Sequence, residues 1–119
     1  MEKRMTITVT SLRPGTIRGQ MVAEAKAKGY RVVFDVLEDL YKVEEGGKYV
    51  IEIRSTPPRQ TSKYLLCGHG YVVSDIKQEL ENPLDVTIFS MWGIIFRFEP
   101  KIRELKPETK YYLCIRPAK

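Results

Sequence analysis

The 119-residue sequence lacks most of the residue patterns that common enzyme classes require. His69 is the only histidine, and Cys67 and Cys114 are the only cysteines. No Walker loop, GxGxxG or HExxH pattern occurs. The acidic residues are scattered, without a pair that suits general acid and base chemistry. The sequence therefore predicts no catalytic residue, no cofactor and no metal site.

Long apolar runs are also absent. No run approaches the roughly 20 residues that a membrane-spanning helix needs. The N-terminus, MEKRMTITVT, has no apolar block followed by a cleavage site, so we expect no signal peptide and a cytoplasmic protein. Cys67 and Cys114 could form one disulfide, but in that compartment the favoured expectation is free thiols that behave as small, buried hydrophobic residues.

Two alternatives use the few reactive side chains. Cys67 and His69 are two residues apart, so on one strand they would share a face and could act as nucleophile and base. Cys67, His69 and Cys114 could also converge on zinc, although zinc commonly takes four ligands and no CxxC pair is present. The simpler interpretation is favoured: a buried cysteine beside a histidine that hydrogen-bonds to the backbone.

Short runs with the two-residue period of β-strands recur along the chain. In MTITVTSL, Met5, Ile7 and Val9 alternate with threonines. Segment 20–28 has high helix propensity but also alternates, so its residues alone leave helix and strand open. A short helical turn is expected around 76–80. The other predicted strands, separated by glycine and proline turns, lie at 30–37, 48–54, 64–74, 86–91, 94–98 and 110–116.

These runs predict an all-β fold. About eight short, mostly antiparallel strands with at most short helical turns, and no linker, indicate a single domain over 1–119, either a sandwich or a closed barrel. Closing the sheet would remove exposed edges. Gly68 and Gly70 flank His69 inside a strand pattern, which marks a bulge, a bend or a close approach of another backbone. We interpret Cys67–Tyr71 as a corner of a small closed barrel.

The charge is modest and unevenly distributed. The net charge is +5, with three basic and no acidic residues in the stretch 54–63. Small OB-type barrels bind single-stranded nucleic acid with aromatic platforms and a basic groove. A free single-strand-binding protein is therefore the alternative function, although tyrosines that merely pack are the simpler interpretation. The residues that would serve it are Tyr30, Tyr49, Tyr64, Tyr71, Arg31, Arg54, Arg59 and Lys63.

Four blocks of the sequence resemble one family, the small OB-fold subunit of archaeal DNA-directed RNA polymerase known as subunit 8. This subunit is the archaeal counterpart of the eighth subunit shared by the eukaryotic nuclear polymerases. The order and spacing of the blocks match nearly the whole chain. The blocks are CGHGYVV at Cys67–Val73, SMWGII at Ser90–Ile95, YYLCI at Tyr111–Ile115 and GYRVVFDV at Gly29–Val36.

The resemblance implies an OB-type closed barrel in which 20–28 is a strand. It also implies a non-catalytic structural and assembly subunit that docks, as a monomer within the complex, on the largest polymerase subunit. Nucleic acid would be reached only through that complex, and no membrane is involved. The loop at 55–62 is shorter than the insertion of eukaryotic members, so functions tied to that insertion are not expected here.

Docking of this kind would use one barrel face, to which an exposed strand edge could add backbone pairing. A lone tryptophan beside a turn glycine often anchors a contact. The alternative is that Trp92 plugs one end of the barrel, and the sequence leaves both interpretations open. The predicted partner-interface residues are Gly68, His69, Gly70, Tyr71, Trp92 and Gly93.

Overall fold

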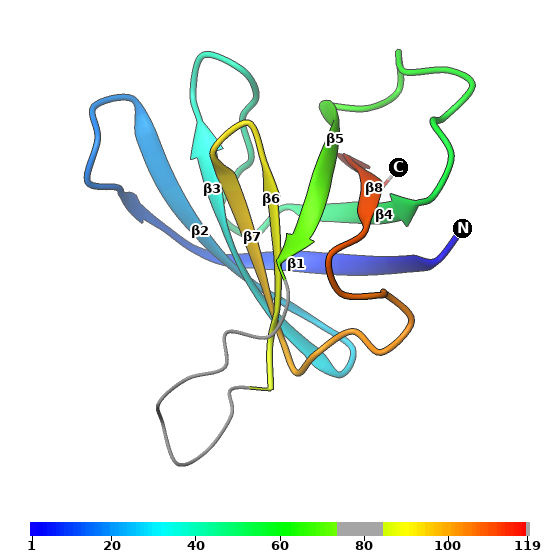
Figure 1. The fold of residues 1–119 in the computed structure, drawn as a ribbon. Helices are drawn as coiled ribbons and strands as arrows, with labels where there is room; N and C mark the ends of the chain where they lie inside the picture. Colours follow the sequence, from blue (N-terminus) through cyan, green and yellow to red (C-terminus); the bar gives the residue numbers. More distant parts are fainter. Residues whose placement is uncertain (74–84, 119) are drawn as a thin grey trace.

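The computed structural model describes residues 1–73 and 85–118, and these form one closed antiparallel barrel (Figure 1). The barrel confirms the predicted fold class, and the described residues contain no helix. Accordingly, no helix of sufficient length and apolarity to span a membrane is found among them. The expected turn around 76–80 lies outside the described residues. The strands are β1 (Lys3–Pro14), β2 (Gln20–Ala27), β3 (Tyr30–Leu37), β4 (Lys48–Arg54), β5 (Leu66–Val73), β6 (Thr87–Met91), β7 (Ile94–Glu99) and β8 (Lys110–Pro117).

The strands follow the order β1-β2-β3-β7-β6-β5-β8-β4 around the barrel, and β4 closes the circuit onto β1. The last strand, β8, thus lies between β4 and β5. Each strand has a neighbour on both sides, so none of the described strands is an open edge strand. The exposed strand edge that could have added to docking is therefore absent from this part of the chain.

Alternation between inward and outward side chains builds the core. Met5, Ile7 and Val9 point inward from β1 and are buried, whereas Thr6 between them is exposed. Segment 20–27 is the strand β2, with Ala23 and Ala25 fully buried. Its small side chains suit the crowded interior, and tertiary packing overrides the helix propensity of the segment. On the neighbouring strands β3 and β7, the paired residues Phe34 and Phe96 stack their rings with centroids 5.0 Å apart.

Gly68 and Gly70 lie on the inner face of β5. A Cβ atom on Gly70 would lie 2.5 Å from the Ser90 carbonyl oxygen, and a Cβ on Gly68 would collide with Met91 Sδ. The ladder between β5 and β8 continues past both glycines without a register shift. The unbroken register rules out a bulge in this ladder, and the close approach of another backbone is confirmed at Gly70.

The β6–β7 hairpin turns at Trp92 and Gly93, as predicted. Their φ angles are +52° and +81°, the pattern of a two-residue turn whose twist matches the flanking strands. The first turn differs from the sequence pattern, in which Arg13-Pro14-Gly15 predicts the turn itself. Strand β1 continues through Pro14, and the hairpin closes where Gly15 N donates to Gln20 O at 2.8 Å.

Two strands depart from the two-residue pattern of burial. In β4 the five residues Tyr49–Ile53 are all buried, and in β8 Leu113, Cys114 and Ile115 are buried. The β4–β5 loop explains this difference, since it runs beside the ends of β4 and β8 (Figure 1). Its residue Leu65 donates from the backbone to Ile115 O at 2.8 Å. The outer face of β4 and β8 is thus covered locally.

Candidate interaction surface

The outer face of β5 carries the exposed members of the predicted interface. His69 and Tyr71 point outward, whereas Gly68 and Gly70 are buried against β6. The two glycines therefore shape the strand and offer no surface of their own. Trp92 and Gly93 are exposed at the tip of the β6–β7 hairpin. The interface role of these exposed residues stays a prediction.

Trp92 does not plug the barrel. Its side chain is 65% exposed, so that alternative is wrong. One edge of the indole nevertheless reaches β5, because its Cη2 atom lies 3.3 Å from where a Cβ on Gly68 would sit. The edge of the indole therefore lies toward the inner side of β5 at Gly68, while most of its surface meets solvent.

Exposed apolar side chains gather over β5, β6 and β7. The register places Tyr71 opposite Ser90, and Ser90 opposite Ile95. Tyr71 is 38% exposed and Ile95 is 36% exposed. Four of the seven large hydrophobic residues that are exposed in the described chain lie in this region, which we call the apolar sector: Tyr71, Val73, Trp92 and Ile95.

Beside the apolar sector, an aromatic pair crosses from β5 to β8. The rings of His69 and Tyr112 stack with centroids 4.2 Å apart and planes 9° from parallel. Tyr112 lies opposite Arg54 of β4 in the next ladder. Arg54, Tyr112 and His69 thus form one row across three neighbouring strands.

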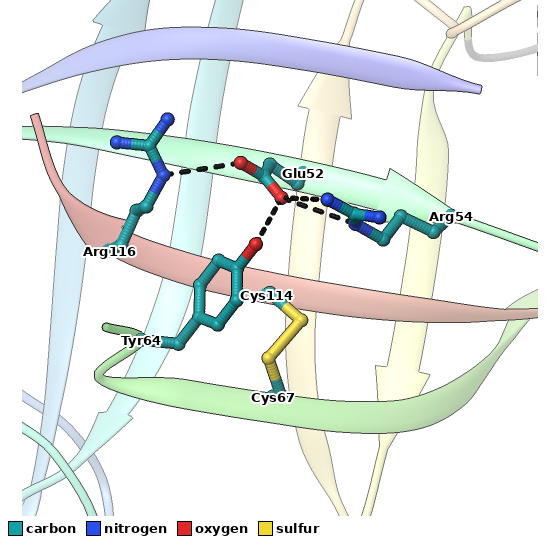
Figure 2. Close-up of a disulfide and its surroundings, with 6 residues drawn as sticks. All are labelled: Glu52, Arg54, Tyr64, Cys67, Cys114 and Arg116. Atoms are coloured by element: carbon teal, nitrogen blue, oxygen red, sulfur yellow. Dashed lines mark hydrogen bonds and ion pairs between the residues drawn. A yellow bond between two sulfur atoms is a disulfide. The ribbon is translucent and has the colours of Figure 1, made fainter. Parts of the chain in front are cut away.

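The adjacent row holds a buried carboxylate. Glu52 points outward from β4 but is only 2% exposed. Its Oε1 accepts hydrogen bonds from Tyr64 Oη at 2.6 Å and from Arg54 Nη2 at 3.0 Å. Its Oε2 accepts one from Arg116 Nε at 3.2 Å. Figure 2 shows the Tyr64 ring reaching across β8 to meet Glu52, so this cluster fixes the end of the β4–β5 loop on the barrel.

The cluster keeps Glu52 ionised. Burial by itself raises the pKa of this carboxyl, but the hydrogen bonds from Tyr64, Arg54 and Arg116 outweigh burial and leave the pKa below its ordinary value. A carboxylate held by two guanidinium groups and a phenol is a stable structural unit and not a poised acid. The sequence pattern does not indicate this cluster. A glutamate on an alternating strand is expected to face solvent until the covering loop is placed.

Cys67 and Cys114 are joined by a disulfide, which corrects the expectation of free thiols (Figure 2). The two residues lie directly opposite each other on β5 and β8, with Cα atoms 4.1 Å apart. The sequence could not decide between this bond and free thiols, because the outcome depends on β8 inserting beside β5. The bonded Cys67 sulfur is not a thiolate nucleophile. Among the described residues, no group of three or more His, Cys, Asp or Glu side chains is arranged to hold a metal ion.

A pocket of about 440 Å³ opens next to the Glu52 cluster. The β4–β5 loop forms most of it, and none of its described lining residues is acidic. Lys63 Nζ also lies 5.2 Å from the centroid of the Tyr64 ring. The residues that define its chemistry are Arg54, Pro57, Pro58, Arg59, Lys63 and Tyr64.

The fold brings only some of the residues predicted for nucleic-acid binding together. Arg54, Arg59, Lys63 and Tyr64 come together in the pocket. Others are used elsewhere: Tyr49 is only 8% exposed. Arg31 forms ion pairs with Glu24 at 2.8 Å and with Glu99 at 3.0 Å. The Tyr30 ring is in contact with Lys3, whose Nζ lies 5.1 Å from the ring centroid.

Comparison with known proteins decides the family. The model of the RpbG family, whose members are described as subunits of DNA-directed RNA polymerase, matches residues 3–118. The chain belongs to the RpbG family. The match extends from β1 to the end of β8, so it spans the whole barrel, including the Glu52 cluster and the apolar sector.

Two curated relatives of this RpbG family chain carry the name DNA-directed RNA polymerase subunit Rpo8. The protein of Saccharolobus solfataricus is 22% identical over 95 residues, which cover 78% of this chain and 71% of the relative. The protein of Saccharolobus shibatae is 20% identical over 120 residues, which cover 94% of this chain and 91% of the relative. The predicted resemblance to an archaeal polymerase subunit is thereby confirmed.

Proposed function

We propose that the chain is a non-catalytic structural and assembly subunit of archaeal DNA-directed RNA polymerase, working in the cytoplasm, and that it docks on the largest subunit of that enzyme. Membership of the RpbG family and the names of the two relatives support the polymerase assignment. The disulfide supports the non-catalytic part, because it removes the only thiols from nucleophilic use.

The apolar sector is the observation that supports docking most directly. Exposed apolar side chains that gather over three strands are typical of a contact surface, whereas isolated ones are ordinary. A stable interface buries about 800 Å² on each partner. The accessible surface of the chain is 7491 Å², so such an interface would take about a tenth of it. One barrel face is large enough.

Trp92 would be the anchor of this interface. Its indole projects from a two-residue turn whose conformation the hairpin fixes, so little conformational entropy is lost when it is buried. Tryptophan and tyrosine are also the residues that most often dominate binding energy. Tyr71, two residues from His69 on β5, would contact the same partner surface.

Affinity purification tests the proposal. A tagged chain expressed in its host should recover the polymerase subunits in equal amounts. The double variant Tyr71→Ala/Trp92→Ala should keep its fold, because both side chains are exposed, and should lose most of the recovered largest subunit. The control is Ile17→Ala/Leu40→Ala, which removes two exposed apolar side chains from other loops, at 67% and 52% exposure.

The proposal fails if the wild-type chain recovers no polymerase. Docking through the apolar sector fails if both double variants recover as much of the largest subunit as wild type. If the control variant alone loses the partner, the contact lies around the β1–β2 and β3–β4 loops instead.

A further inference from the structure

The pocket beside the Glu52 cluster is a preformed cationic site. Pro57 and Pro58 restrict the backbone of the loop that forms it. Tyr64 fixes the far end of that loop through its 2.6 Å hydrogen bond to Glu52. A volume of about 440 Å³ is within the range of small-ligand sites, and it would hold a nucleotide-sized group.

The positive charge of this pocket is largely uncompensated. Arg59 and Lys63 form no ion pair with any residue in 1–73 or 85–118. Arg54 uses Nε and Nη2 for Glu52, which leaves Nη1 without a hydrogen-bond partner among the described residues. The Glu52 carboxylate is buried and shared with Arg116, so it neutralises only part of this charge. The pocket is therefore suited to an anionic ligand.

The surface next to the pocket indicates which anion it suits. Arg54 lies opposite Tyr112, and Tyr112 lies opposite His69. Neighbouring strands are about 4.8 Å apart, so the backbone at His69 lies about 10 Å from that at Arg54. The His69 ring is exposed and already stacked on Tyr112. A flat, exposed ring at this separation is a platform on which a further planar group can stack.

We propose that the pocket binds the phosphodiester backbone of a single-stranded nucleic acid and that the His69–Tyr112 stack receives a neighbouring base. Guanidinium and ammonium groups bind phosphate oxygens through charge-assisted hydrogen bonds, and aromatic rings stack on bases of any sequence. An acidic peptide could use the cations but would make no use of the aromatic stack. The binding is thus direct, in contrast to the sequence-based expectation of contact only through the complex.

The phosphate-binding pocket is separate from the anchor residues of the proposed docking surface. The pocket is built from the β4–β5 loop, whereas those anchor residues are on β5 and the β6–β7 hairpin. The base platform at His69 lies beside that surface, two residues from Tyr71. The inference therefore does not rest on docking and can be measured on the full chain by itself. Failure of one proposal would leave the other standing.

Fluorescence anisotropy with a labelled oligothymidylate of about 12 nucleotides tests the site, since OB folds occupy about 4–16 nucleotides. The variant Arg59→Gln/Lys63→Gln should weaken binding about tenfold or more. It should also reduce the slope of log K against log salt by about 1.4, because two phosphate contacts are lost. Both side chains are exposed and lie outside the Glu52 cluster, so an unchanged melting curve is expected.

The matched control is Arg18→Gln/Lys42→Gln, which removes the same two charge types from exposed positions elsewhere. It should change the affinity less than about threefold. His69→Ala should weaken binding about fivefold or more without changing the salt slope, because it removes stacking and no phosphate contact. A general loss of positive charge would instead weaken binding equally in both Arg/Lys double variants, and it would not explain weaker binding by His69→Ala at an unchanged salt slope.

Several outcomes would overturn the proposal. Equal effects of the two Arg/Lys double variants would indicate non-specific attraction to the net charge. The pocket would be assigned to an acidic protein segment if polyglutamate competed as well as the oligonucleotide at equal charge. The same conclusion would follow if His69→Ala bound the oligonucleotide with unchanged affinity. Inorganic phosphate that competes equally at the same phosphate concentration would assign it to a free anion. Loss of polymerase recovery by Arg59→Gln/Lys63→Gln with unchanged oligonucleotide binding would also reject it.

Discussion

Cys67 of β5 and Cys114 of β8 face each other across a register pair and are joined by a disulfide between positions 47 residues apart. The bond ties β5, which carries part of the predicted interface, to β8, the last strand of the chain. It lies one row from the His69–Tyr112 stack and directly beside the Glu52 cluster (Figure 2). The outer face of the barrel is therefore held together here by covalent, ionic and aromatic contacts.

Loss of this disulfide should lower the free energy of unfolding by about 2–4 kcal/mol, because the bond restricts the unfolded chain. Guanidinium titrations with and without a phosphine reductant would measure the difference, and Cys67→Ser/Cys114→Ser should match the reduced protein. Iodoacetamide should label neither cysteine when the unreduced protein is unfolded. Two labelled cysteines in that sample would contradict the bond.

Glu52 should make stability depend on pH in the acid range. The folded pKa of this carboxyl is lowered from its ordinary value of 4.5, so its contribution is complete above that value and is lost as the pH falls through the folded pKa. At neutral pH, Glu52→Gln should cost about 1–3 kcal/mol, since it weakens charge-assisted hydrogen bonds to Arg54 and Arg116. The difference in free energy of unfolding between the wild type and Glu52→Gln should become smaller below pH 4.5.

Urea titrations of both proteins at a series of pH values would provide this measurement, and the difference between the two curves isolates residue 52 from the other carboxyls. Tyr64→Phe is the companion variant, because it removes one hydrogen bond to Glu52 and keeps the ring. A constant gap at all pH values would show that Glu52 does not titrate differently in the folded chain.

Alanine substitutions at the two glycines of β5 should differ in cost. The Cβ of Gly70→Ala would meet a backbone carbonyl, Ser90 O, which the β5–β6 pairing holds in place, so we expect a loss of about 1–3 kcal/mol or more. The Cβ of Gly68→Ala would meet the flexible end of Met91, which can change rotamer, so the loss should be smaller. Thermal melts of both variants give the ranking. A larger loss at Gly68 would contradict the described contacts.

The fluorescence and ¹⁹F signals of Trp92 should report whether its indole is exposed to solvent. It is the only tryptophan of the chain and is 65% exposed, so acrylamide should quench its fluorescence efficiently in the isolated protein. With 5-fluorotryptophan incorporated only in this chain, the ¹⁹F signal should lose its solvent isotope shift when the largest subunit is added. A shift that persists in the assembled complex would place Trp92 outside the interface.

Local pattern was enough to predict most of the strands. The alternation in β1, the turn at Trp92-Gly93 and the glycine-bounded run around His69 each depend on residues close in sequence. The pattern failed where local preferences conflicted. In segment 20–27 the residues have high helix propensity but alternate like a strand, so they do not decide between the two. The resemblance to the polymerase family favoured the strand.

The candidate sites were less predictable, because they depend on which strands become neighbours. His69, Tyr71 and Trp92 could be singled out from the sequence. Only the folded barrel shows that these three are exposed whereas Gly68 and Gly70 are buried. Arg54, Arg59, Lys63 and Tyr64 could be proposed as a group, and only the folded β4–β5 loop places them around one pocket.

The sequence by itself determined the all-β class, the strand positions and the family blocks, since these follow from side-chain period and turn chemistry within a few residues. Only the tertiary structure decided the bond between Cys67 and Cys114 and the burial of Glu52. Both follow from the last strand inserting between β4 and β5. Such long-range pairing is set by closure of the whole barrel, and no local stretch of residues encodes it.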